Sequence, residues 1–188
     1  MNRIRGLELP EMSVEQKCIY DKIMASRGGI RGPQGIWLRR PGFSDPAQEL
    51  GAFCRFGTSL QQKLVELVII MAAAHFKAQY EWFAHARLAL KAGLNPDIVA
   101  AIRTGGIPAE MEPMESILYR FCRSLLRNNR VNDQLYQEAL ATFSENALIE
   151  IVGILGYYAM VAYTLNAFAV SMPPGELPPF AEPIDVGE

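Results

Sequence analysis

The chain has 188 residues, half of them hydrophobic, which is enough for one domain with a sizeable core. A formal net charge of −2 gives no general attraction for nucleic acid or anionic lipid, and the local arginine clusters lack the interleaved aromatic residues of a nucleic-acid-binding surface. Cys18, Cys54 and Cys122 form no CxxC pair, so the sequence encodes neither a dithiol redox centre nor a zinc knuckle of that type. No secretory signal is evident, and we expect a cytoplasmic protein with free thiols.

The first helix is expected between Ser13 and Gly28. Ser13 and Gln16 have the spacing of a capping box, and a pair of glycines is a typical helix end. Residues 28–43 are rich in glycine, proline and arginine and predict a long loop, a feature that often carries function. Its guanidinium groups and the indole of Trp37 could cover a pocket for a ligand with a carboxylate, or Trp37 could simply anchor an ordered surface loop.

Two helices are expected next along the chain. Asp45–Pro46 has the pattern of an N-cap followed by proline at the first helical position, and it predicts a helix to about Arg55. Thr58 and Ser59, with glutamines three residues further on, predict the cap of a helix that runs to about His75.

Caps and apolar periodicity predict the remaining helices. Asn95–Pro96 opens a short helix that Gly105–Gly106 closes, and residues 112–128, 132–143 and 144–170 form three more. Because alternating β-branched runs are absent from the sequence, we predict a single all-α domain. Its parts are an N-terminal helix and loop (1–44), a core (45–106), a second helical half (107–172) and an extended tail (173–188).

Residues 151–172 contain no charged side chain and are long enough to span a bilayer. No lysine or arginine flanks this stretch, Glu150 precedes it, and three tyrosines interrupt it. A helix that is apolar on all sides can equally be a core helix or an oligomer interface. We therefore predict a soluble protein with no membrane segment.

Residues 64–70 and 148–154 are similar to each other, with Glu66 and Glu150 at matching places. This similarity suggests a degenerate internal repeat, although short apolar helices also resemble one another by chance.

Residues 64–93 contain both histidines of the chain, His75 and His85, and two carboxylates set among apolar residues, Glu66 and Glu81. Glu81 and His85 are four residues apart, which places them one turn apart on the same face of a helix. A helical wheel drawn at roughly 100° per residue turns that face toward the protein interior. Burying these groups unpaired is costly, so we expect them to pair, either as a structural hydrogen bond or as the proton-transferring groups of a site.

Residues 50–106 resemble the carboxymuconolactone decarboxylase family, whose superfamily includes alkylhydroperoxidase D. The segments that carry the resemblance are RFGTSL (55–60), ELVI (66–69), YEWFAH (80–85) and AGL (92–94). The segments GPQGIWLR (32–39) and RVND (130–133) are similar to a subgroup of that family with about this chain length. The resemblance implies an all-α fold of the alkylhydroperoxidase D type, assembly as a homo-trimer or hexamer, and a cavity near the subunit contacts that binds a small-molecule substrate.

The peroxidase branch of this family uses a glutamate, a CxxC pair and a histidine four residues after the second cysteine. These positions fall on Glu66, Ala78, Glu81 and His85, so both thiols of the motif are absent. Peroxide reduction by thiols needs an attacking thiolate and a resolving thiol, and we do not expect it here. The decarboxylase branch instead has a glutamate four residues before the histidine, as this chain does.

The resemblance to the decarboxylase branch implies acid/base chemistry, by decarboxylation or lactone isomerisation, on a small unsaturated or cyclic carboxylate from aromatic catabolism. The catalytic candidates are then His85 as proton shuttle, Glu81 as the group that orients it or shares its proton, and Glu66 as a second relay carboxylate.

Arg39, or another loop arginine, is expected to hold the substrate's carboxylate, with Trp37, His75 and Tyr80 as further substrate-binding candidates. We predict no cofactor and no metal. Three alternatives remain: a metal site of Glu66, His75, Glu81 and His85, a peroxidase-related antioxidant protein that uses another thiol, and a non-catalytic binding protein.

Overall fold

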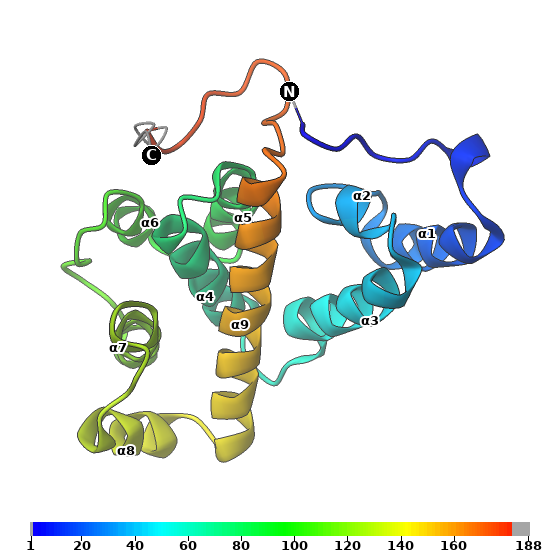
Figure 1. The fold of residues 1–188 in the computed structure, drawn as a ribbon. Coiled ribbons are helices and arrows are strands. Elements are labelled where there is room, and N and C mark those ends of the chain that lie inside the picture. Colours follow the sequence, from blue (N-terminus) through cyan, green and yellow to red (C-terminus); the bar gives the residue numbers. More distant parts are fainter. Residues whose placement is uncertain (1, 182–188) are drawn as a thin grey trace.

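The computed structural model describes residues 2–181, and these form an all-helical protein without a β-strand (Figure 1). The predicted all-α class is therefore confirmed. A 3₁₀ turn lies at Leu9–Glu11 and a π-helical turn at Phe53–Gly57. The α-helices are α1 (Val14–Arg27), α2 (Gln34–Trp37), α3 (Pro41–Ala52), α4 (Gln62–His75), α5 (Gln79–Lys91), α6 (Pro96–Arg103), α7 (Pro113–Asn128), α8 (Asp133–Thr142) and α9 (Glu145–Ala167).

Helix α4 forms the centre of the core. Every residue from Leu64 to Ala74 is buried, because this stretch is apolar on all sides except at Glu66. Helices α5, α7 and α9 pack against α4, and the long α9 runs through the middle of the view in Figure 1. A carboxylate in such a helix needs a polar partner inside the protein, so Glu66 marks a polar site within the core.

Helices α1, α2 and α3 form a separate N-terminal group, which Figure 1 shows on the opposite side of α9 from α6, α7 and α8. α3 packs against both α1 and α2. Ile19 and Ile23 of α1 form a small apolar cluster with Met12 and Leu38, distinct from the main core. The space between this group, α5 and α9 is where the candidate site lies.

Several helices begin and end where the sequence predicts. The Ser13 hydroxyl accepts a hydrogen bond from the backbone N–H of Gln16, and the backbone N–H of Ser13 donates one to the side-chain oxygen of Gln16. Gly28 ends α1 with a φ of 68°. The predicted caps at Asn95 and Ser144 also form, at the starts of α6 and α9. Short polar side chains at these points satisfy backbone N–H groups that a helix leaves unpaired.

The predicted start of α3 at Asp45–Pro46 is wrong. The helix begins at Pro41, and Pro46 lies inside it. Pro41 sits in the first turn, where its missing N–H costs no hydrogen bond. Asp45 is used in an ion pair with Lys22, with 2.7 Å between carboxylate oxygen and Nζ, and therefore does not act as a cap. The segment predicted as a loop also contains the short helix α2.

The predicted cap of α4 at Thr58 and Ser59 is wrong as well. The helix starts at Gln62, and its N-cap residue, Gln61, makes no side-chain capping bond. Ser59 donates its N–H and its hydroxyl to Glu150 of α9, at 2.9 and 2.7 Å. A contact distant in sequence has thus replaced the local cap.

Helix α5 carries Glu81 and His85 on its buried face, as the helical wheel predicts. The chain turns between α4 and α5 at Lys77, which has a φ of 52°. Ala78 is fully buried, whereas Arg87 on the other face is exposed. The turn brings α5 back alongside α4, so the inward face of α5 meets Glu66.

Helix α9 is long and apolar enough, by length and composition, to cross a membrane, but half of its most apolar window is buried inside the protein. It packs against α4, α5 and α8, which is the position of a core helix. After α9, the Phe180 backbone exchanges two hydrogen bonds with the Gln79 side chain, and its ring packs edge-on against Trp82. The end of the predicted extended tail, residues 182–188, lies outside the described residues.

Candidate active site

The three predicted catalytic side chains meet in the core. His85 of α5 lies between two carboxylates: its Nδ1 is 2.7 Å from Glu66 Oε2, and its Nε2 is 3.0 Å from Glu81 Oε1. One turn before Glu66 on α4, Gln62 donates its amide N–H to the other oxygen of Glu66 at 2.9 Å. Glu66 is 1% exposed, and Glu81 and His85 are each 5% exposed, so all three side chains are buried.

The two carboxylates favour the doubly protonated, cationic form of His85. Burial is the largest single influence on the ring and lowers its pKa, but Glu81 and Glu66 together outweigh burial and raise the pKa of His85 to about 9. Each ring nitrogen then presents an N–H to one carboxylate. At neutral pH the His85 ring therefore carries an extra proton between the carboxylates of Glu66 and Glu81.

A cavity of about 460 Å³ opens beside the triad, and Glu81 and His85 line it. Its volume lies in the range of small-molecule sites. Tyr157 and Tyr158 of α9 form another wall, and the ring of Tyr158 packs edge-on against His85 with 5.2 Å between centroids. Burial raises the pKa of Tyr157 to about 12 and that of Tyr158 well above its ordinary value, so both remain neutral phenols.

Close packing of α3 against α9 positions one of these phenols. A Cβ atom on Gly51 would lie 2.1 Å from the hydroxyl oxygen of Tyr157 and 2.7 Å from Nη2 of Arg27. Only glycine allows this approach, which brings phenol and guanidinium together at the cavity. The π-helical turn that follows α3 places Arg55 at the same cavity, and such turns recur at functional sites.

Of the predicted substrate-binding residues, the structure places Tyr80 in this cavity and the others elsewhere. Trp37 is buried, its Nε1–H donates to Thr164 Oγ1 at 3.0 Å, and its ring packs edge-on against Tyr157 from outside the cavity. This is the anchoring role that the sequence left open for Trp37. His75 is exposed at the end of α4 and lines two other, smaller cavities.

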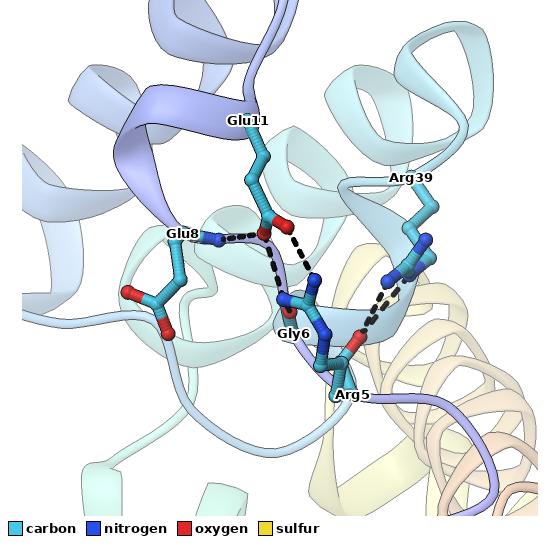
Figure 2. A network of polar contacts seen from close by, with 5 residues as sticks. All are labelled: Arg5, Gly6, Glu8, Glu11 and Arg39. Atoms are coloured by element: carbon cyan, nitrogen blue, oxygen red, sulfur yellow. Dashed lines mark hydrogen bonds and ion pairs between the residues drawn. The ribbon is translucent and has the colours of Figure 1, made fainter.

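Arg39 is exposed and does not line the cavity. Its Nε and Nη2 donate to the carbonyl oxygen of Arg5 at 3.1 and 3.0 Å, and Figure 2 shows this contact next to the ion pair between Arg5 and Glu11. The guanidinium therefore fastens the N-terminal segment to the end of α2. Its position does not support a role for Arg39 in holding a substrate inside the cavity.

The cavity contains polar residues that the sequence did not single out. Arg27, Arg31 and Arg55 line it, together with the buried Gln34 of α2. The sequence pointed to a loop arginine only in general terms, because a loop pattern does not show which side chains turn inward. In the sequence, the paired tyrosines of α9 appear only as polar interruptions of an apolar run.

The thiols do not contribute to this cavity, since none of the three cysteines lines it. Burial raises the pKa of Cys54 to about 11 and that of Cys122 to about 12, so both thiols stay protonated. Cys18 is exposed on α1. Within residues 2–181, no group of three or more His, Cys, Asp or Glu side chains is arranged to hold a metal ion.

No protein-family model and no curated protein matches the sequence. Solved structures match most of the chain. An uncharacterized peroxidase-related protein from Ralstonia eutropha JMP134, described as an alkylhydroperoxidase AhpD core, is 12% identical, with a TM-score of 0.77 over 92% of this chain and 93% of its own. A peroxidase-related protein from Silicibacter sp. TM1040 is 14% identical, with a TM-score of 0.71 over 91% of this chain and 92% of its own.

The debrominase Bmp8, in a variant in complex with 2,3,4-tribromopyrrole, is also similar. It is 13% identical, with a TM-score of 0.73 over 91% of each chain. At such identities the similarity defines the fold and not the chemistry. The chain therefore has the alkylhydroperoxidase D-like helical fold.

Proposed function

We propose that this protein is an acid/base enzyme similar to carboxymuconolactone decarboxylase, which acts on a small unsaturated or cyclic carboxylate from aromatic catabolism by decarboxylation or lactone isomerisation. The observation that carries the proposal is the buried triad of Glu66, His85 and Glu81, two of whose members line a cavity. A purely structural pair would need no space beside it. The complex of a similar fold with 2,3,4-tribromopyrrole adds that this fold accommodates a small ring.

The proton held by the triad is the reagent of this mechanism. Both ring nitrogens of His85 face carboxylates, so His85 exchanges its proton with the substrate through Glu81. Glu66, held in turn by Gln62, stays on the far nitrogen and keeps the ring charged. Glu81 is thus the group that meets the substrate, and His85 is the proton reservoir behind it.

The two reactions use this proton differently. In decarboxylation the bond to the carboxyl carbon breaks, CO₂ leaves, and the electron pair stays on the substrate as an enolate-like carbanion. Glu81 then delivers the proton to that carbon, and water reprotonates the triad. In lactone isomerisation Glu81 takes a proton from one carbon and the triad returns it to another. General acid–base catalysis of this kind contributes about 10²–10⁴-fold to a rate.

Turnover of small unsaturated and hydroxylated aromatic carboxylates, followed by ultraviolet absorbance and CO₂ release, tests the proposal. Glu81→Gln keeps the length of the side chain and its contact with His85 but removes its ability to carry a proton. We expect turnover to fall by about 10²-fold or more. The variant should stay folded but unfold at a lower temperature, because Gln no longer helps to raise the pKa of His85. Arg39→Gln, outside the cavity, is the matched control and should keep full activity. Equal turnover by Glu81→Gln and the wild type would refute the assignment.

A peroxidase-related antioxidant protein is the second candidate, because two solved structures of this fold are described as peroxidase-related proteins. A thiol mechanism would have to use cysteines outside the CxxC positions, of which two are buried and protonated. Hydroperoxide turnover in a variant with all three cysteines replaced by serine separates the candidates. Loss of turnover only in this variant favours a thiol peroxidase. Ligand binding without any turnover would favour a binding protein.

We also infer a cytoplasmic homo-oligomer, a trimer or hexamer, as the family resemblance implies. Ile149, Val152 and Tyr163 are exposed along one face of α9, and a neighbouring subunit would remove this apolar surface from water. Light scattering after size-exclusion chromatography measures the assembly, and a monomer at all concentrations would contradict this inference.

A further inference from the structure

We propose that Arg27 and Arg55 bind a carboxylate group of the ligand inside the cavity that Glu81 and His85 line. The proposal rests on the proposed function for the reaction, and it adds the groups that select the substrate. Binding of the carboxylate itself does not depend on which reaction follows. Arg27 is the last residue of α1 and Arg55 lies in the π-helical turn after α3, so both reach the cavity from the N-terminal group of helices.

Neither guanidinium is neutralised by the part of the chain that the structure describes. No carboxylate of residues 2–181 forms an ion pair with Arg27 or Arg55. The Nε atom of each is buried and has no hydrogen-bond partner among these residues. Arg27 makes one long hydrogen bond, 3.4 Å from Nη2 to the carbonyl oxygen of Gln48. Buried charged donors without partners are costly, so this arrangement favours an anion from outside the chain.

The charges around the cavity also leave room for an anion. With His85 protonated, the triad carries one net negative charge, because the imidazolium offsets one of its two carboxylates. Arg31 adds a further cation at the exposed rim of the cavity. Arg87, which also lines the cavity, is already paired with Glu176 at 2.9 Å. Counted over residues 2–181, the arginines at the cavity without an ionic partner supply more positive charge than the triad supplies negative charge. An anionic ligand therefore brings the site closer to neutrality.

The walls of the cavity favour a small planar organic acid over inorganic phosphate. The flat fork of a guanidinium matches a carboxylate, and the aromatic walls of Tyr80, Tyr157 and Tyr158 can bury an unsaturated ring. Gln34 is 3% exposed, and its side-chain oxygen has no partner among residues 2–181, which leaves a neutral polar group for the ligand on the same wall.

The carboxylate held by these arginines is one that the reaction retains. Two guanidinium groups stabilise a carboxylate more strongly than neutral CO₂, so they would lower the energy of the substrate relative to the transition state if that same group were lost. The clamp therefore positions the molecule, while a second carboxylate or a carbon of the lactone ring faces Glu81. A substrate that the enzyme decarboxylates must then carry two carboxylates, whereas a substrate that it isomerises needs only one.

Isothermal titration calorimetry with benzoate and with muconate tests the subsite, with benzamide as the neutral counterpart of benzoate and inorganic phosphate as the other anion. Arg27→Met and Arg55→Met keep much of the aliphatic stem. We expect each to weaken carboxylate binding at least about tenfold, the scale of one charge-assisted hydrogen bond. Arg39→Met is the matched control and should bind as the wild type does. Arg27→Lys and Arg55→Lys, which keep the charge, should retain part of the affinity.

Folding gives an independent readout. Because Arg55 is half-buried and has no ionic partner within the described part of the chain, Arg55→Met should unfold at the same temperature as the wild type or higher. Benzoate should raise the unfolding temperature of the wild type more than that of the variant.

Binding that requires both arginines and excludes benzamide supports the subsite. The subsite is overturned if neither carboxylate binds the wild type, if both methionine variants bind like the wild type, or if phosphate binds more tightly than either carboxylate. Glu81→Gln separates the two proposals. Arginine-dependent binding in a protein whose turnover does not depend on Glu81 would refute the mechanism and leave the subsite standing. Turnover that depends on Glu81 but not on the arginines would refute the subsite and leave the mechanism standing.

Discussion

Loss of the proton from His85 should make the folded state less stable as the solution becomes alkaline. Folding raises the pKa of His85 from 6.5 to about 9. Each pKa unit corresponds to about 1.4 kcal/mol, so the protonated ring stabilises the fold by about 3 kcal/mol where it is fully charged in both states. A raised pKa means that this contribution is complete below pH 6.5, declines above it, and is lost as the pH passes 9.

Glu66→Gln removes one of the two carboxylates that raise this pKa. We expect the pKa of His85 to fall by at least about one unit, and the alkaline loss of stability to move to lower pH by the same amount. Nuclear magnetic resonance titration of the imidazole protons measures the pKa directly, because the chain has only two histidines. His75 serves as internal reference: burial, Arg127 and Lys77 lower its pKa, so the two rings should titrate far apart.

Urea unfolding below pH 6.5 and above pH 9 measures the corresponding free energies. A His85 ring that titrates near 6.5 in the wild type, or an unfolding free energy that stays constant across this window, would refute the reasoning. Either result would mean that the triad does not hold a proton between two carboxylates.

Two further predictions concern the walls of the cavity. Gly51→Ala should destabilise the fold by about 1–3 kcal/mol, because its Cβ would overlap the Tyr157 hydroxyl. Gly42→Ala on the same helix meets open space and serves as the control, and thermal unfolding compares the two variants. Trp37→Phe should cost about 1 kcal/mol through the lost hydrogen bond to Thr164 and leave benzoate affinity unchanged, whereas a loss of affinity would return Trp37 to the binding site.

The sequence predicted the helices well where the signals are local. Ser13, Asn95 and Ser144 cap helices because their oxygens reach N–H groups two or three residues further on, an interaction that sequence spacing alone defines. The prediction failed at Asp45 and Ser59 because both side chains bind residues distant in sequence, Lys22 and Glu150 respectively. No local pattern contains those partners.

The same distinction applies to the candidate site. Helical spacing put Glu81 and His85 on one inward face, and an acid in an apolar helix marked Glu66 as a group in need of a partner. The arginines could not be chosen by spacing, because the direction of a loop side chain depends on how α1, α2 and α3 pack. Arg27 immediately precedes the segment predicted as a loop and Arg39 lies in it, yet Arg39 contacts a backbone carbonyl outside the cavity and Arg27 lines the cavity.

Under the proposed function, residue 81 determines which chemistry the triad performs. In the resemblance to the peroxidase branch, Glu81 occupies the position of the second cysteine, four residues before His85, and Ala78 occupies the position of the first. A carboxylate at residue 81 still meets Nε2 of His85 at 3.0 Å, so the proton path from Glu66 through the ring to the cavity is continuous. A carboxylate cannot pass electrons to a peroxide as a thiolate does, but it can give and take a proton. Glu81→Cys should therefore remove acid/base turnover without creating peroxidase activity, because Ala78 leaves no resolving thiol. Peroxide reduction by this single variant would show that thiol peroxidase chemistry in this site does not need cysteines at both residues 78 and 81.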